Sequence, residues 1–187
     1  MKTTKISIVC LFLVFGLFWI TPDSNSQDVK LSRQERKEVR KAQMAENFAI
    51  LDSLLNAKMF VLEADYLQDN YGNIKPVLST LNFIKVNGAT GILQTGSSAS
   101  IGSNDVGGTT AEGRIGEWKV TKYVKSLSYY LRFNLITQIG NYDILMTVSS
   151  DNVASATISG LGPGKLTWRG HLETLNNSRI FKGQNTI

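Results

Sequence analysis

The stretch SYYLRFNLITQIGNYDILMTVSSDNVASATIS, residues 128–159, decides the fold. Apolar side chains occupy every second position within residues 128–138 and again within residues 142–149. This alternation is typical of strands that bury one face. A Gly-Asn pair and an Asp-Asn pair supply turn residues between the segments. We therefore expect three consecutive antiparallel strands, the third covering residues 153–159.

The same alternation continues on both sides of this stretch. Further strands are predicted at residues 60–66, 81–86, 89–94, 113–124 and 165–173. Asn87-Gly88 is a strong hairpin signal between two of them. Sequential strands joined by tight turns predict a mainly β fold, an antiparallel up-and-down barrel of about eight strands, because closure removes exposed edges. Such a barrel is either filled by side chains or holds one small ligand.

An α-helix is predicted before the strands, over residues 32–57. Ser32 and Glu35 form a capping-box pattern at its start. The apolar residues of its second half, Met44, Phe48, Leu51 and Leu55, lie on one stripe. We expect this stripe to pack on the chain's own barrel.

The first half of the predicted helix is basic. It contains Arg33, Arg36, Lys37, Arg40 and Lys41, nearly balanced by Glu35, Glu38, Glu46 and Asp52. We interpret the segment as a solvated helix face, with a polyanion-binding or membrane-surface patch as the alternative. With a formal net charge of +5 over the whole chain and no larger basic face, the sequence does not indicate nucleic-acid binding.

Residues 1–26 read as a cleaved signal peptide. Lys2 and Lys5 precede an apolar run over residues 6–20, and small residues lead to a cleavage site after Ser26. The alternative, a retained anchor, needs roughly 20 apolar residues. The one cysteine, Cys10, lies inside the run, so a lipid anchor is not expected. We expect residues 27–187 to form a single domain, periplasmic or secreted, without disulfides or a stable membrane anchor.

The sequence offers few residues for catalysis, so we expect no enzyme and no cofactor. His171 is the only histidine and the predicted mature chain has no cysteine, which excludes a His-rich metal site and a Cys-His pair. We interpret His171 as an exposed or hydrogen-bonded structural residue. Glu63 and Asp65, close to Asp69, form the best carboxylate pair. A weak calcium site is conceivable there, and solvated strand charges are the alternative.

The stretch over residues 88–116 is rich in glycine, serine, threonine and alanine. It is interpreted either as a binding loop or lid at one mouth of the barrel, or as a connection without a role.

The arrangement resembles the bacterial domain-of-unknown-function family 4251, common in Bacteroidota. The resemblance rests on residues 142–149, residues 153–159 and the terminal Trp168-Arg169-Gly170-His171-Leu172. It implies a lipocalin-like barrel in the bacterial envelope, and it assigns no activity and no functional residues. The chain departs from the family pattern at Leu93-Gln94-Thr95-Gly96, where Leu-Pro-Tyr-x-Gly is expected.

Two functional hypotheses follow. In the first, the barrel binds a small apolar or amphipathic ligand, with Trp118, Phe133 and Trp168 as lining. In the second, the barrel interior is filled, and the basic start of the helix, residues 33–41, binds a protein partner in the envelope.

Overall fold

The computed structural model describes residues 32–97, 106–160 and 164–186. The predicted signal peptide, residues 1–26, lies outside them. Residues 37–187 form one compact unit, which contains the barrel. Of the preceding unit, residues 1–36, the described part is the start of the helix.

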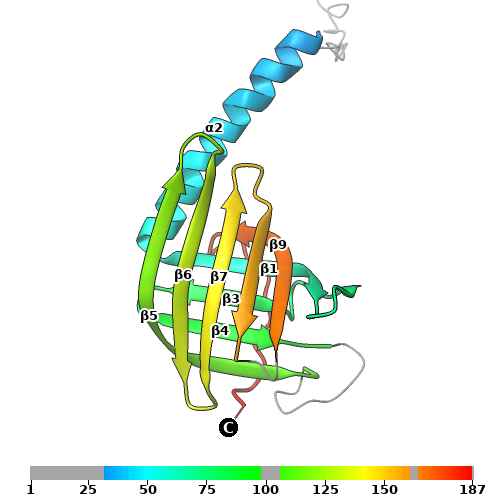
Figure 1. Ribbon diagram of the computed structural model, residues 1–187, viewed down its shortest axis with the longest axis vertical. Coiled ribbons are helices and arrows are strands. Elements are labelled where there is room, and N and C mark those ends of the chain that lie inside the picture. Colours follow the sequence, from blue (N-terminus) through cyan, green and yellow to red (C-terminus); the bar gives the residue numbers. More distant parts are fainter. Residues whose placement is uncertain (1–31, 98–105, 161–163, 187) are drawn as a thin grey trace, which may run out of the picture. The chain divides into compact units, whose positions relative to one another are not determined.

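Eight antiparallel strands close into a barrel with one N-terminal helix (Figure 1). In the order in which they pair, these strands are β1 (Met59–Gln68), β3 (Phe83–Asn87), β4 (Thr90–Thr95), β5 (Thr109–Tyr123), β6 (Ser128–Thr137), β7 (Asn141–Ser149), β8 (Ala154–Ser159) and β9 (Lys165–Glu173). β9 pairs back with β1 and closes the barrel. A further short strand, β2 (Ile74–Pro76), pairs with the end of β1. The predicted up-and-down barrel is therefore confirmed, and β2 is an addition that the sequence pattern did not indicate.

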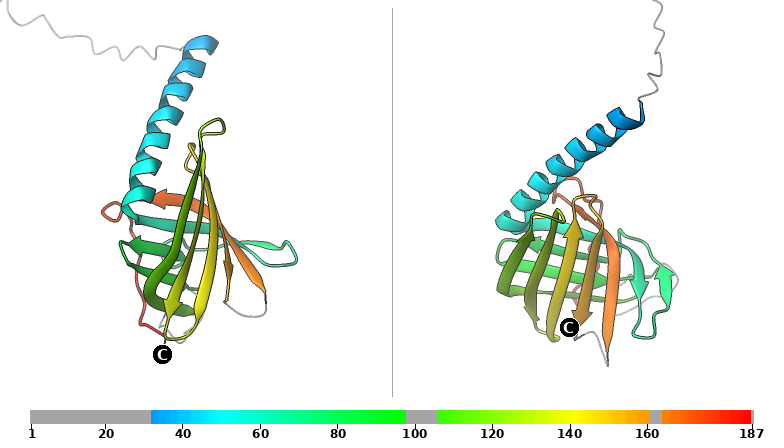
Figure 2. Two further views of the ribbon diagram at one scale, coloured as in Figure 1. Left: turned by 60° about the vertical axis from the view of Figure 1, so that its left-hand side comes forward. Right: turned by 45° about the horizontal axis from the view of Figure 1, so that its top comes forward.

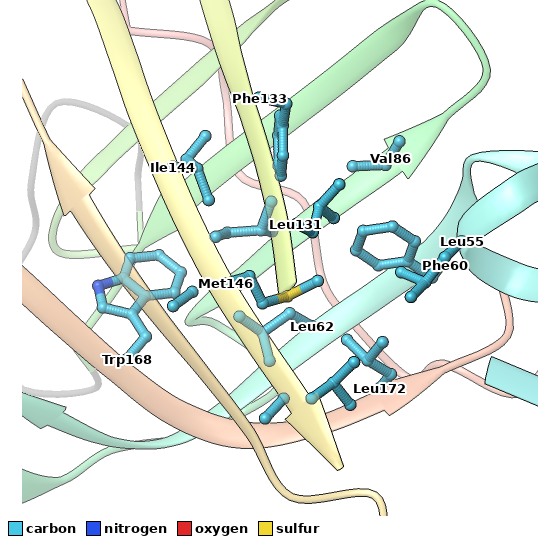
Figure 3. Close-up of a cluster of buried hydrophobic side chains, with 14 of the residues drawn as sticks. Leu55, Phe60, Leu62, Val86, Leu131, Phe133, Ile144, Met146, Trp168 and Leu172 are labelled. Atoms are coloured by element: carbon cyan, nitrogen blue, oxygen red, sulfur yellow. The ribbon is translucent and has the colours of Figure 1, made fainter. Parts of the chain in front are cut away.

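All eight barrel strands contribute to one buried core (Figure 3). Its largest fully buried members include Trp168, Tyr129, Phe60, Phe133, Leu62 and Leu131. The alternation that predicted β6 and β7 is present as expected: Leu131 and Phe133 of β6 and Ile144 and Met146 of β7 all face this core.

A β-bulge changes the direction of side chains along β1. Up to Ala64 the even-numbered residues face the core, but the pairing with β9 shifts between Ala64 and Tyr66. Beyond this bulge Leu67 packs against the core, and Tyr66 is 49% exposed. An unbroken alternation along the predicted strand would have placed Tyr66 on the face of Phe60, but one extra residue in a strand reverses the alternation.

A second bulge does the same on β5. Ile115 packs against the core before it, and Trp118 and Val120 do so after it. Glu117 at the bulge has a φ of 47°. This change of phase brings Trp118 inward, where an unbroken alternation from Ile115 would have placed Glu117.

Gly170 allows β9 to approach β1 closely at the β1 bulge. A Cβ atom at this position would collide with the carbonyl oxygen of Glu63. Sterics thus explain why glycine stands in Trp168-Arg169-Gly170-His171-Leu172, since no side chain fits between the two strands at this point.

The helix α2 (Arg33–Ala57) begins and ends within one residue of its predicted bounds. The Ser32 N–H donates to Glu35 Oε2 over 2.7 Å, and the Glu35 N–H donates to Ser32 Oγ over 3.3 Å. This is the predicted capping box. Phe48, Leu51 and Leu55 are buried in the barrel core, so the second half of the helix covers one end of the barrel.

The glycine-rich stretch is not one loop. Its beginning lies in β4, and its end, from residue 109 onward, lies in β5. Residues 98–105 lie outside the described part of the chain. The strands predicted at residues 89–94 and 113–124 are present at these two flanks, and β5 begins four residues before its predicted start.

The C-terminal tail, residues 174–186, covers part of the outside of the barrel. Leu175 and Ile180 pack against Val61, Phe83 and Ile92, which form a second buried cluster on the outer face of β1, β3 and β4. The sequence pattern predicted no element here. The tail gives three neighbouring strands a buried outer face in addition to their buried inner one.

Candidate functional site

The three aromatic residues expected to line a ligand cavity lie in or against the barrel core. Trp168 and Phe133 are 0% and 1% exposed. Trp118 is half-buried, and its ring lies 5.1 Å from that of Phe133 and 6.2 Å from that of Phe60, centroid to centroid. Lys58 Nζ lies 5.1 Å from the Trp118 ring centroid. The Trp118 ring therefore packs with the rings of Phe133 and Phe60, and Trp168 is part of the same buried core.

Trp168 nevertheless carries one unusual feature. Its indole Nε1 is buried and has no hydrogen-bond partner among the described residues. Buried donors are nearly always paired. This unpaired N–H could bind an acceptor atom of a small molecule or a water.

Outside the barrel, the β1 bulge brings together the charged residues that the sequence singled out. His171 Nδ1 lies 3.3 Å from Asp65 Oδ2, and His171 Nε2 lies 3.9 Å from Glu63 Oε2. The Ser178 hydroxyl donates to Glu63 Oε1 over 2.6 Å. We call Glu63, Asp65, His171 and Ser178 the bulge cluster.

The connections within the bulge cluster are those of a structural network. Nucleophilic catalysis requires a hydroxyl that is hydrogen-bonded to its base, with the base oriented by a third group. Here the Ser178 hydroxyl is bonded to a carboxylate, and each ring nitrogen of His171 faces a different carboxylate. Glu63, itself buried, also accepts the Arg179 N–H over 3.3 Å. The cluster therefore fixes the C-terminal tail to β1, and His171 is a hydrogen-bonded residue as one interpretation of the sequence expected.

Asp69 is not part of this cluster. Its Oδ1 accepts the N–H groups of Tyr71 and Asn73, each over 2.9 Å, and its Oδ2 accepts the Asn73 side-chain amide over 2.8 Å. These hydrogen bonds lower the pKa of Asp69, and the bond from the Asn73 side chain has the largest effect. Among the residues that the structure describes, no three His, Cys, Asp or Glu side chains converge to hold a metal ion. The three carboxylates considered for calcium are thus divided between two separate local networks.

Gln94 is a buried polar residue whose role the sequence did not reveal. Its side-chain NH2 donates to the carbonyls of Leu81 and Phe181, and its Oε1 accepts from the Thr110 hydroxyl and the Gly183 N–H, over 2.8 to 3.1 Å. It lies in the segment that departs from the family pattern. The sequence did contain a hint of this role, because Gln94 occupies a predicted strand at the position where the family pattern has a proline-containing motif.

A third network joins α2 to the barrel. Asp52 Oδ1 accepts hydrogen bonds from Lys122 Nζ over 2.9 Å and from the Tyr129 hydroxyl over 2.8 Å. These two hydrogen bonds lower the pKa of Asp52, and the bond from Lys122 has the larger effect. Burial raises the pKa of Tyr129. Lys122 Nζ also lies 4.9 Å from the centroid of the Phe48 ring. The network holds the second half of the helix against β5 and β6.

A shallow groove lies beside this end of α2. It has a volume of about 290 Å³. Its lining comprises Asn47, Ile50, Leu51, Leu54, Asn152, Leu172, Glu173, Thr174 and Asn177. The floor is apolar and the rim carries amides, but the volume is at the lower limit for a small-molecule site.

The basic residues of α2 are exposed. The side chains of residues 32–43 are accessible on all sides of the helix. Within residues 32–97, 106–160 and 164–186, no helix has the length and apolar character needed to cross a bilayer.

Comparisons with known proteins agree with this architecture. The model of the family described as "Domain of unknown function (DUF4251)" matches residues 42–172. A crystal structure of a DUF4251 family protein from Bacteroides eggerthii DSM 20697 is similar, with a TM-score of 0.62 and 29% sequence identity over 74% of this chain and 96% of that one. No protein with a curated description matches. The barrel, the helix and the matched residues together show that the chain belongs to the DUF4251 family.

Proposed function

We propose that the protein is an exported, non-enzymatic interaction protein of the bacterial envelope, in which the barrel is a scaffold and the basic start of α2 binds an acidic partner protein. The observation that carries this proposal is the barrel interior. Side chains from all eight barrel strands and from α2 meet there in one buried cluster, which includes two of the aromatic residues expected to line a ligand. A core of this kind stabilises a fold and leaves recognition to its surface.

The first half of α2 supports the choice of surface. Over residues 33–41 it has five basic residues against two acidic ones, and all are exposed. An isolated helical segment of this length is marginally stable in water. A helix that is polar on all sides needs another source of support, and an acidic partner would supply it.

Export is part of the same proposal. The charged start, the apolar run and the small-residue exit of residues 1–26 support a cleaved signal peptide. The product is periplasmic or secreted, which places the basic helix among envelope components.

Two triple variants with equal charge loss test the proposal. Lys37→Gln, Arg40→Gln and Lys41→Gln remove three charges from α2, and Gln retains helix propensity. Arg114→Gln, Lys119→Gln and Lys125→Gln remove three exposed charges from the barrel. With about 0.5 kcal/mol for each exposed ion pair, we expect the helix variant to recover about tenfold less cross-linked partner from the host envelope. Equal recovery of partner with the helix variant and with the barrel variant would contradict the proposal.

A second candidate function, binding of a small ligand inside the barrel, is favoured by the unpaired indole N–H of Trp168. The affinity for a molecule that accepts a hydrogen bond from this N–H would depend on the presence of the donor. Trp168→Phe removes the donor and keeps most of the ring volume. Mass spectrometry of solvent extracts of protein purified from its host would then show a small molecule with the wild type and much less with the variant. Identical extracts would remove this candidate.

A further inference from the structure

The β1–β2 hairpin projects from the barrel and presents apolar side chains to solvent. We call residues 66–78 the finger; it comprises the end of β1, β2 and the residues on either side of β2, and Figure 2 shows it extending beyond the barrel wall. Tyr71 at its turn is 92% exposed, and Leu78, Tyr66 and Ile74 are 51%, 49% and 49% exposed. Tyr66 and Ile74 share one face of the hairpin, and Tyr71 stands at the turn between their strands. Exposed apolar side chains gathered in this way are of the kind that marks an interaction site.

Hydrogen bonds hold the finger in this conformation. Asp69 accepts two backbone N–H groups of the turn, including that of Tyr71. Asn70 Oδ1 accepts the Lys165 N–H over 2.7 Å, which ties the turn to the start of β9. Gly72 has a φ of +88°, a conformation that favours glycine. The exposed tyrosine is therefore presented on an ordered turn, so binding through it costs little ordering entropy.

Cationic side chains lie on and beside the finger: Arg169 is paired with Tyr66 and shares its face, and Lys75 is paired with Leu67 on the opposite face. Lys75, Lys165 and Arg169 are all exposed. Arg169 is oriented by a hydrogen bond to Gln68 Oε1 on the finger, over 2.9 Å. The one acidic side chain within the finger, Asp69, is engaged by the donors of its own turn. The finger thus combines a convex apolar tip with flanking positive charge.

We propose that the finger binds reversibly to an anionic lipid surface. Tyrosine is favoured at the boundary between headgroups and acyl chains, because its ring is apolar and its hydroxyl is polar. Ile74 and Tyr66, on one face of the hairpin, add apolar area for shallow insertion. Lys75, Lys165 and Arg169 match the negative headgroups, and long cationic side chains reach the headgroup layer while their stems contact apolar surface.

Vesicle flotation with protein purified from its host tests this site. We expect the wild type to float with phosphatidylglycerol-containing vesicles and about tenfold less with phosphatidylcholine vesicles, and added salt should weaken the binding. Tyr71→Ser with Ile74→Ser should reduce flotation about tenfold. Val124→Ser with Val153→Ser is the matched control, because these residues are 66% and 60% exposed in turns at the other end of the barrel.

The outcomes separate this proposal from the one for α2. Circular dichroism should show the same fold for both double variants, since all four side chains are exposed. Failure of the wild type to float with anionic vesicles would overturn the lipid site. It would also be overturned if the finger variant floated like the wild type, or if Lys37→Gln, Arg40→Gln and Lys41→Gln abolished flotation while the finger was intact. None of these results depends on whether α2 binds a protein.

Discussion

The barrel has two outer walls that differ in what covers them. On β1, β3 and β4 the outward side chains Val61, Phe83 and Ile92 are buried under the C-terminal tail. On β6 and β7 the outward side chains Arg132 and Leu145 are exposed. The inner faces of both walls meet in the same core. The comparison teaches that a barrel of one topology can carry a second small core outside, provided that another segment of the chain covers it.

The covered wall also contains two buried polar residues, Gln94 and Glu63, that are bonded to the tail. Gln94 is bonded to the tail at Phe181 and Gly183, and Glu63 is bonded to it at Ser178. A buried polar group costs free energy unless it is paired. The tail therefore supplies hydrogen-bond partners as well as apolar cover. Partners of the protein would have to bind the surfaces that remain open.

The largest effect is expected from removal of the tail. A chain that ends at Thr174 exposes Val61, Phe83 and Ile92 and leaves Gln94 without two of its partners. At about 1.5 to 3 kcal/mol for each large apolar side chain, the loss of unfolding free energy should be roughly 5 kcal/mol. Urea unfolding followed by circular dichroism measures it. A loss below about 1 kcal/mol would mean that the tail does not cover this wall in solution.

The next largest effect is a difference in unfolding free energy between single substitutions on the two walls. Phe83→Ala on the covered wall creates a cavity and should lower the unfolding free energy by about 3 to 5 kcal/mol. Leu145→Ala on the open wall removes a side chain that is 36% exposed, and the loss should stay below about 1 kcal/mol. Thermal or urea denaturation of both variants gives the comparison. Similar losses for the two would remove the distinction between the walls.

A smaller effect is expected from the buried amide. Gln94→Ala removes the acceptor of the Gly183 N–H and the donor to the carbonyls of Leu81 and Phe181, at a cost of about 2 kcal/mol. Gln138→Ala, in an exposed turn, serves as the control and should change stability by less than about 0.5 kcal/mol. If the two glutamine variants unfolded at the same urea concentration, the hydrogen bonds of Gln94 to the tail would have no net effect.

The smallest effect concerns pH. Lys182 Nζ, with Asn185, donates a hydrogen bond to Glu112 and lowers the pKa of that carboxyl. A lowered pKa stabilises the fold above the ordinary carboxyl pKa, and this stabilisation disappears as the pH falls through the lowered value. The pair is half-exposed, so its contribution should be below about 1 kcal/mol. Wild type and Glu112→Gln should therefore differ in stability at neutral pH and converge in acid; a constant difference would refute the role of this pair.

Much of the barrel could be predicted because its pattern is local. The alternation in β6 and β7, the turn residues between them and the capping box of α2 all act over a few neighbouring residues. The two bulges could not be predicted in this way. Neither Asp65 nor Glu117 is a glycine, and the register shifts arise from pairing with distant strands. This is why an unbroken alternation along β1 would place Tyr66 on the wrong face.

The site residues show the same limit. Glu63, Asp65 and His171 were each noted in the sequence, but their proximity depends on a bulge and on the close approach that Gly170 permits. The tail has neither a two-residue nor a helical period, so nothing in it indicated a covering segment. Its bonds to Gln94 join residues that lie 87 and 89 positions apart.

Amide hydrogen exchange of the full-length protein tests the role of the tail most directly. The N–H groups of Phe181, Gly183 and Thr186 are bonded to Thr80, Gln94 and Thr110 of the barrel. If the tail is part of the covered wall, these three amides should exchange as slowly as those of β4, over minutes to hours. Exchange of all three within seconds, at the rate of a frayed terminus, would contradict the account. It would mean that the outer face of β1, β3 and β4 is exposed to solvent.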